Sequence, residues 1–282
     1  MNCIVETIAG KIEYNVYGNG KPIVFLHGGH SNSQEKLFLK GYNKNCFKLI
    51  VPSRPGYGKT PISNKTTHKD AAQLIIALLD VLQIKKCVVV GISAGGLTAI
   101  QMAATYPNRV EKLLLISAIT QKWLSPEDTL YKMGKIVFSP MVERFTWSVY
   151  RLLFSLLPKT MTKVLFKQVS SITNTTITEN EICEVKKMVS VQRSKKGFVA
   201  DLDHDISNDA ITKIKCPTLI LHSKNDKSVA IAMAHHANTN INNSILKVYN
   251  NKWGHLLWLG KDSEAPIADA NSFINSENIR YK

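Results

Sequence analysis

The sequence predicts an α/β fold built on a mostly parallel sheet. Short apolar runs at Pro22–Leu26, Cys87–Val90 and Pro217–His222 are typical of strands that are buried on both faces. Segments with the apolar spacing of a helix stand between such runs, as in Asp70–Leu82. Strands that alternate with helices along a chain predict a parallel sheet with right-handed crossovers.

The elements can be assigned in order from the N-terminus. Cys3–Ile8 and Lys11–Tyr17, joined by a turn at Gly10, predict an antiparallel hairpin. The first buried strand follows, and we expect a helix at Asn32–Lys40 and the next strand at Phe47–Val51.

Beyond the helix at Asp70–Leu82, the alternation continues and then stops. A buried strand at Cys87–Val90 leads into a helix at Ser93–Tyr106, which Pro107 ends, and Val110–Ile116 is the next strand. From about 121 to 212 the sequence has helical periodicity and polar breaks but no strong strand.

The strand and helix rhythm resumes near the C-terminus. Pro217–His222 is a buried strand, and Val229–Ala237 a helix. A last strand at Ile245–Tyr249 and a closing helix at Ala265–Ile274 complete the pattern. The sequence therefore predicts an α/β core at 1–120 and 213–282 and a helical cap at 121–212.

Charge and composition narrow the classes of partner. The 282 residues carry a formal net charge of +15, mostly from lysine. A basic patch would attract nucleic acid or an anionic membrane, but the lysines occur in isolated pairs rather than runs, and no basic, aromatic-rich motif of a nucleic-acid module is present. We therefore expect a solvated, scattered charge and no nucleic-acid partner.

The cysteines and the hydropathy pattern suggest the compartment. Five widely spaced cysteines without a C-x-x-C pair do not form a disulfide framework or a zinc site. Neither a signal peptide nor a long uncharged apolar stretch is visible. We expect a cytoplasmic monomer or homodimer without stable membrane insertion.

The segment Gly91-Ile92-Ser93-Ala94-Gly95 directly follows a buried strand and precedes a helix. G-x-S-x-G at such a turn exposes a serine oxygen above the sheet, at a helix N-terminus that favours developing negative charge. Side chains at Gly91 and Gly95 would collide with neighbouring chain. The alternatives are a glycine-rich turn with an incidental serine and a phosphate loop, although no Lys-Ser/Thr follows.

A nucleophilic serine needs a base and an acid that orients the base. We predict His255, which lies a few residues after the last strand, as the base. Asp226, four residues beyond a strand end, is the predicted acid, because the expected chain order is Ser, Asp, His. Asp226 can equally cap a helix, and Asp203 and Asp205 are reserve candidates.

The first long parallel strand ends at His27-Gly28-Gly29-His30. We predict that the backbone N–H groups of Gly29 and Ala94 form the oxyanion hole, because a glycine allows close approach of the backbone. A metal site at His27 and His30 is disfavoured, because no carboxylate lies beside them in the sequence. We predict no metal.

Taken together, several motifs resemble those of the α/β-hydrolase superfamily. They are Phe25-Leu26-His27-Gly28-Gly29, Arg54-Pro55-Gly56-Tyr57-Gly58-Lys59-Thr60, Gly91–Gly96, Pro217–Asp226 and Gly254-His255. The resemblance implies an eight-stranded, mostly parallel sheet, a cap after the sixth strand, no cofactor, and the triad Ser93, Asp226 and His255. Ser93 argues against the related dehalogenase and epoxide hydrolase branches, which use an aspartate nucleophile.

The predicted cap is rich in apolar and aromatic residues, with arginines and lysines beside them. These residues can form a substrate pocket, an amphipathic surface for membranes, or packing between cap and core. As substrate-binding residues we predict His30, Phe145, Trp147 and Trp253.

These observations predict an esterase-like serine hydrolase that cleaves a small-molecule ester or acyl substrate through an acyl-enzyme. Carbon–carbon or thioester hydrolysis, amide hydrolysis and acyl transfer on the same triad stay open, since fold alone does not separate them. So do a non-catalytic, ligand-binding protein with this fold and a peripheral membrane protein held by the cap.

Overall fold

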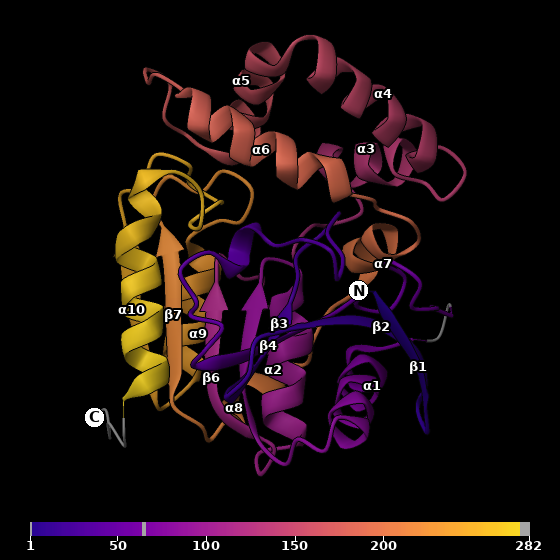
Figure 1. Cartoon of the computed structure of the whole chain (residues 1–282), viewed down its shortest axis with the longest axis vertical. Coiled ribbons are helices and arrows are strands. Elements are labelled where there is room, and N and C mark those ends of the chain that lie inside the picture. The colour runs from indigo at the N-terminus through magenta and orange to yellow at the C-terminus, as the bar shows by residue number, and fades with distance from the viewer. Residues whose placement is uncertain (1, 64–65, 277–282) are drawn as a thin grey trace.

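Eight strands form one mixed, mostly parallel sheet with helices on both faces (Figure 1). The structure is a computed structural model that describes residues 2–63 and 66–276. The strand order is β1-β2-β4-β3-β5-β6-β7-β8, in which β1–β2 and β2–β4 pair antiparallel and the others parallel. The predicted eight-stranded sheet is confirmed. The strands are β1 (Cys3–Thr7), β2 (Gly10–Tyr17), β3 (Lys21–Leu26), β4 (Phe47–Pro52), β5 (Cys87–Ile92), β6 (Val110–Ile116), β7 (Thr218–Ser223) and β8 (Ser244–Tyr249).

The central strand β5 explains why the buried runs are continuous rather than alternating. All six of its residues are buried. Val89 packs into the apolar cluster on one face of the sheet, whereas Val88 and Val90 pack into the cluster on the other. A strand covered on both faces needs apolar side chains at every position.

Four longer helices cover the sheet: α1 (His68–Val81), α2 (Gly95–Thr105), α9 (Ala232–Asn240) and α10 (Glu264–Asn275). α1 begins with a capping box, in which the Thr67 hydroxyl accepts from the Asp70 N–H and the Asp70 carboxylate accepts from the Thr67 N–H.

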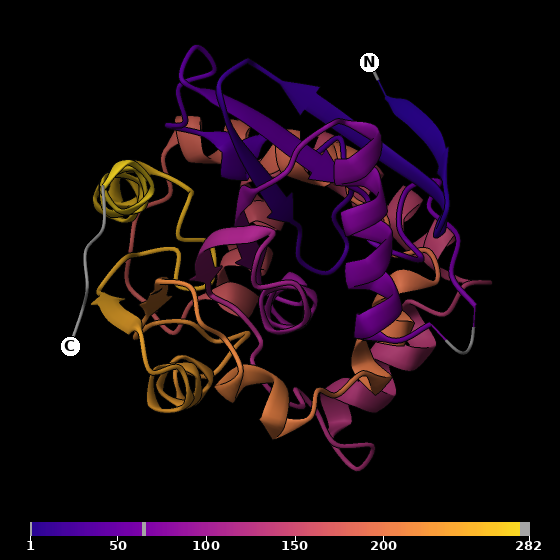
Figure 2. The same ribbon diagram turned by 90° about the horizontal axis from the view of Figure 1, so that it is seen from below.

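Seen from below, the N-terminal hairpin and α10 lie toward opposite sides of the molecule (Figure 2).

The prediction of a helix at Asn32–Lys40 is wrong. This segment is a loop with one 3₁₀ turn, η1 (Leu37–Leu39). The Asn32 side chain accepts a hydrogen bond from the Gln34 N–H, and the Glu35 carboxylate accepts one from the Leu37 N–H. Short polar side chains that bond to the backbone nearby compete with the helical hydrogen-bond pattern.

A helical insertion stands between β6 and β7, as predicted, and lies across the carboxyl ends of the parallel strands (Figure 1). Its helices are α3 (Thr129–Val137), α4 (Glu143–Leu156), α5 (Pro158–Val169), α6 (Glu179–Val191), α7 (Gly197–Asp203) and α8 (Asn208–Thr212). α8 packs against α2 and α9 of the core. The boundaries of the cap at 121 and 212 stay a prediction. A second 3₁₀ turn, η2 (Lys261–Ser263), precedes α10.

A buried ion pair fastens the insertion to the core. The Arg54 guanidinium donates to both carboxylate oxygens of Asp201, at 2.8 and 2.7 Å, and both side chains are almost fully buried. Tyr57 donates to the same carboxylate. Burial alone raises the pKa of Asp201, but the charge of Arg54 and the hydrogen bonds of Arg54 and Tyr57 outweigh it and lower that pKa.

The length and polarity of a helix decide whether it can span a membrane. Within residues 2–63 and 66–276, each helix is too short or too polar to span a lipid bilayer.

Candidate active site

Ser93 occupies the tight turn between β5 and α2. Its φ is 50°, in the left-handed region that few side chains adopt. A Cβ on Gly95 would lie 2.0 Å from the carbonyl oxygen of Leu26, so a side chain at this position cannot fit. The Ser93 carbonyl in turn accepts hydrogen bonds from the N–H groups of Gly96 and Ile119, each at 2.9 Å. Two backbone hydrogen bonds therefore hold the strained turn, and the close approach of Leu26 requires glycine at position 95.

His255 stands between this serine and Asp226. Its Nε2 is 3.1 Å from Ser93 Oγ, and its Nδ1 is 2.8 Å from Asp226 Oδ2. An ionised carboxylate only accepts hydrogen bonds, so Nδ1 carries the hydrogen and Nε2 presents a lone pair to the serine hydroxyl. This is the arrangement that a general base requires.

The Asp226 side chain is fully buried, and both of its oxygens are occupied. Oδ2 faces His255, while Oδ1 accepts from the N–H groups of Ser228 and Val229 at 2.9 and 2.8 Å. The side chain thus closes the turn that precedes α9, so the capping alternative is also partly met. The reserve acids do not reach His255: Asp203 binds Tyr131 and Lys135, and Asp205 accepts from the Ile206 N–H.

His222 is a neighbour of the acid that the sequence analysis did not single out. Its Nε2 lies 3.4 Å from Asp226 Oδ2 and 3.0 Å from the Val229 carbonyl oxygen. Both are acceptors, so Nε2 is the protonated nitrogen. Burial lowers the pKa of His222, which keeps the ring neutral. A histidine that ends an apolar run, four residues before the acid, was the signal that could have revealed it.

The end of α5 connects the acid loop with the base loop. The carbonyl oxygen of Val169 accepts hydrogen bonds from the backbone N–H groups of His255, at 2.9 Å, and Lys227, at 3.3 Å. The Ser171 N–H donates to the Asn225 carbonyl oxygen at 3.0 Å. No apolar period or motif marks these backbone contacts, so the sequence could not predict them.

The predicted oxyanion hole lies where β3 ends. A Cβ built on Gly28 would lie 2.9 Å from Ser93 Cβ, so the loop runs close against the serine. Across residues 2–63 and 66–276, no protein group accepts a hydrogen bond from the N–H of Gly29 or of Ala94. Both donors are therefore available to an oxygen of a substrate, and their role stays a prediction.

His27 stiffens this loop. Its Nδ1 donates to the Gly28 carbonyl oxygen at 2.8 Å, and its Nε2 accepts from the Arg54 N–H at 3.0 Å. Burial, followed by the charge of Arg54, lowers the pKa of His27 to about 3, so the ring is neutral and supports the turn.

His30 has a φ of 64° and carries its ring into an aromatic cluster beside the loop. The rings of Phe198, Phe138 and Trp147 lie 3.9, 4.3 and 5.4 Å from it between centroids. Burial lowers the pKa of His30 to about 3.

Ser194 determines which nitrogen of His30 carries the hydrogen. Its Oγ accepts from Trp147 Nε1 at 2.7 Å and is 2.7 Å from His30 Nδ1. In the described part of the chain the hydroxyl has no other acceptor, so it donates to Nδ1 and leaves the hydrogen of His30 on Nε2.

The other predicted substrate residues occupy different environments. Trp147 is buried and touches His30, as described above. Trp253 is fully buried, donates to Glu181 at 2.8 Å and packs on the Phe166 ring. Phe145 lies on the outer face of α4 and is 72% exposed, so the structure does not bring it to the triad.

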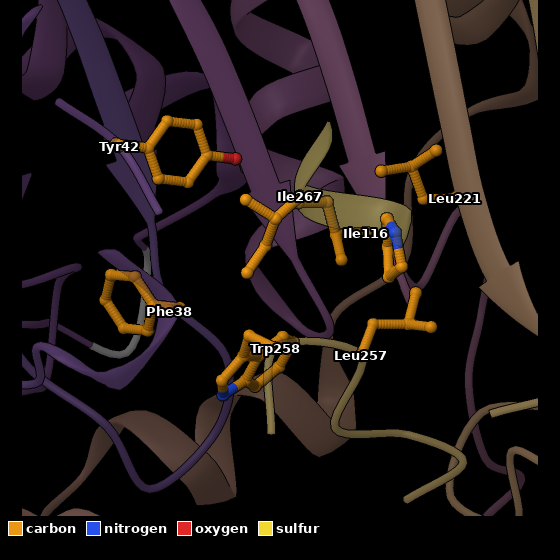
Figure 3. Close-up of a pocket in the computed structure, with 8 residues that line it drawn as sticks. Phe38, Tyr42, Ile116, Leu221, Leu257, Trp258 and Ile267 are labelled. Carbon is orange, nitrogen blue, oxygen red and sulfur yellow. The ribbon is translucent and has the colours of Figure 1, made fainter. Parts of the chain in front are cut away.

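Figure 3 shows a small apolar pocket at the ends of β6 and β7. Its free space is about 20 Å³, which holds about one water molecule. None of the triad residues lines it, and we assign it no role in binding. The lining residues are Phe38, Tyr42, Ile116, Leu221, Leu257, Trp258, Pro266 and Ile267.

Comparison with known proteins shows which family the chain belongs to. Residues 21–262 match the model of the alpha/beta hydrolase fold. The chain belongs to the alpha/beta hydrolase fold family. The predicted superfamily is confirmed, and the protein is a hydrolase of this fold.

Three similar proteins each match more than four fifths of the chain. An uncharacterized hydrolase, YcgS, from Bacillus subtilis (strain 168) is 40% identical over 281 residues, covering 96% of this chain and 99% of that protein. A 2-hydroxy-6-oxononadienedioate/2-hydroxy-6-oxononatrienedioate hydrolase from Pseudomonas putida is 26% identical, with 86% and 85% covered. The solved structure of the esterase EaEST from Exiguobacterium antarcticum superposes with a TM-score of 0.72 at 22% identity, covering 98% of this chain and 100% of that one.

Proposed function

We propose that this alpha/beta hydrolase is a serine esterase that cleaves a small, uncharged carboxylic ester through an acyl-enzyme. The observation that carries the proposal is the continuous hydrogen-bonded chain from Ser93 Oγ through His255 to the buried Asp226, with distances of 3.1 and 2.8 Å.

The proposed reaction has two halves. Ser93 Oγ attacks the ester carbonyl while His255 Nε2 takes its proton, and the N–H groups of Gly29 and Ala94 bind the oxyanion. The tetrahedral intermediate expels the alcohol, which takes the proton from His255, and leaves an acyl group on Ser93. Water then attacks the acyl carbon, gives a proton to His255, and the carboxylic acid leaves as Ser93 recovers its proton.

Two paired arginines favour an uncharged substrate. The backbone N–H of Arg54 donates to His27, and the backbone N–H of Arg193 donates to the His30 carbonyl oxygen. Both arginines therefore belong to segments that contact the oxyanion loop. Arg54 is paired with Asp201 and Arg193 with Glu143. Their charges are already neutralised and are poorly placed to hold a free carboxylate of a substrate.

His30 is the side chain that we assign to substrate contact. Its Nε2–H has no partner within the described residues and is not fully buried. A neutral N–H donor beside the oxyanion loop suits the ether oxygen or an acyl-side oxygen of an ester. Trp147 positions His30 through Ser194.

A second candidate is carbon–carbon hydrolysis on the same triad. It is favoured by the relative from Pseudomonas putida, whose name gives a dienedioate and a trienedioate as substrates. Such substrates carry two carboxylates, and the paired arginines weigh against them.

The test combines a fluorophosphonate probe with two substrate classes. Wild-type protein is expected to be labelled and to hydrolyse p-nitrophenyl esters, while Ser93→Ala loses both, with kcat/KM reduced by at least about 10⁴. Ser190→Ala, at an exposed serine on α6, is the matched control and keeps both.

Other outcomes decide between the alternatives. Turnover of a 2-hydroxy-6-oxo-dienedioate without turnover of esters would replace the proposal with the second candidate. A wild-type protein that neither labels nor turns over either class would favour a ligand-binding protein. The chain-length optimum of the esters defines the size of the acyl pocket.

A further inference from the structure

The outer face of α4 exposes an unusual amount of apolar side chain. Of the sixteen large hydrophobic residues that are exposed in the described parts of the chain, eight lie between Met141 and Leu157. Met141 is 95% exposed and Leu156 66%. Contiguous apolar patches of this kind mark surfaces that meet another apolar phase.

The spacing of these residues gives α4 a second apolar side, in addition to the side that is buried. The exposed side chains, which we call the α4 stripe, recur every three or four residues, so those within α4 share one side of the helix, and Met141 lies in the turn just before it. They are Met141, Phe145, Val149, Leu152 and Leu156. The opposite side of α4 carries Trp147 and Phe154, which are buried against the rest of the protein. The stripe is thus additional to the face that packs the insertion.

The charge around the stripe has one sign. Residues 140–169 contain five basic side chains and a single acid, Glu143. That acid is buried and paired with Arg193, so it does not offset the basic groups at the surface. The basic residues are Arg144, Arg151, Lys159, Lys163 and Lys167.

A basic groove opens beside the start of the stripe. It has a volume of about 480 Å³ and is lined by Pro140, Glu143 and residues of the loop between Gly56 and Ile62. Lys59, Lys195 and Lys196 also line it. The groove offers cationic groups next to the exposed Met141 and can receive anionic head groups.

From these features we infer that the α4 stripe and its basic flanks dock on an anionic phospholipid bilayer. The apolar side chains enter the boundary between head groups and acyl chains, and the lysines contact the negative lipid surface. In Figure 1, α4 and α5 form the edge of the molecule farthest from the lower ends of the strands, so no other element obstructs a flat surface there.

A second copy of the chain is a poorer occupant. In a two-fold dimer the same patch faces itself, so the basic residues beside one stripe would face those of the other. Like charges brought together disfavour such a contact, whereas an anionic bilayer complements them.

Docking in this way would bring the site to the lipid surface. The inner face of α4 carries Trp147, whose ring lies 5.4 Å from that of His30 between centroids. The stripe is on the outer face of the same helix, and a helix with its side chains is about 10 Å thick. The inference does not depend on the proposed esterase activity, because binding is measured without turnover.

The experiment is co-sedimentation of the full chain with two kinds of vesicle, phosphatidylcholine alone and an equal mixture with phosphatidylglycerol. We expect binding to the mixed vesicles, weaker binding to phosphatidylcholine, and loss of binding to the mixed vesicles as salt shortens the Debye length. Equal binding to both vesicles, or binding to neither, would overturn the inference.

Three variants separate the stripe from the charges. Met141→Ser/Leu152→Ser/Leu156→Ser is expected to weaken binding to the mixed vesicles at least about tenfold. Lys159→Glu/Lys163→Glu is expected to weaken it by at least about fivefold per residue. Ile8→Ser, at a residue that is 98% exposed in the N-terminal hairpin turn, is the control and binds like wild type.

Folding and self-association are checked on the same samples. Circular dichroism and thermal unfolding establish that the variants are folded, and the charge variant keeps the test decisive where the triple variant does not fold. If the triple variant Met141→Ser/Leu152→Ser/Leu156→Ser is folded and binds like wild type, the inference is wrong. Dimerisation through the stripe in sedimentation velocity, without vesicle binding, would identify a second copy as the occupant instead.

Discussion

The carbonyl oxygen of Val169 accepts a 2.9 Å hydrogen bond from the backbone N–H of His255. Val169 is the last residue of α5 in the insertion, and His255 lies in the loop after β8. The same oxygen is 3.3 Å from the N–H of Lys227, next to Asp226. The position of the candidate base therefore depends on the insertion as well as on the sheet.

Gly254→Ala tests this dependence. Gly254 has a φ of 51°, and a Cβ there would lie 2.4 Å from the Val169 carbonyl oxygen and 2.5 Å from that of Asn225. The displaced loop is expected to lower kcat/KM for an ester about 10²-fold, since small misplacements of a catalytic group have effects of this size.

The matched control is Gly10→Ala, whose φ is also positive, at 118°, but whose Cβ would meet nothing within 4 Å. It should lose stability from the strain of its own positive φ and keep its activity. Wild-type kcat/KM in Gly254→Ala would show that the contact with Val169 does not position the base.

Asp226→Asn should separate orientation of the base from closure of the turn. The Asn oxygen can still accept from the N–H groups of Ser228 and Val229, but its amide N–H₂ would face His255 Nδ1 and favour the wrong tautomer. We expect kcat to fall about 10⁴-fold with little change in the free energy of unfolding.

Asp226→Ala is the companion variant. It should lose activity to a similar extent and also lose about 1 kcal/mol or more in urea unfolding, because the turn N–H groups lose their acceptor. Activity of Asp226→Asn within tenfold of wild type would remove Asp226 from the triad.

Ser194→Ala removes the hydroxyl between Trp147 and His30. The Trp147 N–H and His30 Nδ1 would each lose a partner at 2.7 Å, and Ser194 is fully buried. The free energy of unfolding is expected to fall by about 1–3 kcal/mol, the usual cost of leaving buried polar groups unpaired.

The matched control is Ser190→Ala, because the Ser190 hydroxyl is exposed and donates to the Lys187 carbonyl oxygen. This variant should change the free energy of unfolding by less than about 0.5 kcal/mol. If Ser194→Ala also alters KM for esters while kcat stays constant, His30 contacts substrate as proposed. Equal stability of the two variants would contradict the assigned hydrogen bonds.

Glu35 makes stability depend on pH. Burial raises the pKa of its carboxyl group from 4.5 to about 7. An acid that binds its proton more tightly in the folded chain favours folding less and less as pH rises from about 4.5 through about 7. Over this range the wild type should lose on the order of 2–3 kcal/mol from this residue.

Glu35→Gln resembles the protonated acid and should abolish that loss, which makes the variant more stable than wild type above about pH 7. Glu264→Gln, at an exposed position, should leave the pH dependence unchanged. Urea unfolding across this range measures both, and parallel curves for wild type and Glu35→Gln would refute the assignment.

Much of the core was predictable because its signals are local. Apolar runs mark the strands of a sheet that is covered on both faces, and the turn at Ser93 needs glycine on either side. The three residues expected to act together do meet, since each follows a strand and the carboxyl ends of parallel strands share one edge.

What escaped prediction depends on contacts between distant segments. Val169 acts through its backbone and Ser194 through a side chain that contacts residues far away in the chain, and neither kind of contact leaves a period in the sequence. His222 is different, because it lies only four residues before Asp226. The helix expected at Asn32–Lys40 failed because side chains of Asn32 and Glu35 bond to nearby N–H groups. Phe145 follows apolar spacing, which cannot tell the inner face of a helix from the outer one.

The bond from Val169 to His255 also limits how this enzyme could be recombined with its relatives. A chimera that exchanged the insertion for a foreign one would have to deliver a carbonyl oxygen to the same place, whatever residue supplied it. If the foreign segment ends before Val169, this protein still supplies the acceptor oxygen. If the foreign segment extends past Val169, it must supply the acceptor itself. The useful junctions for such engineering therefore lie on the N-terminal side of Val169.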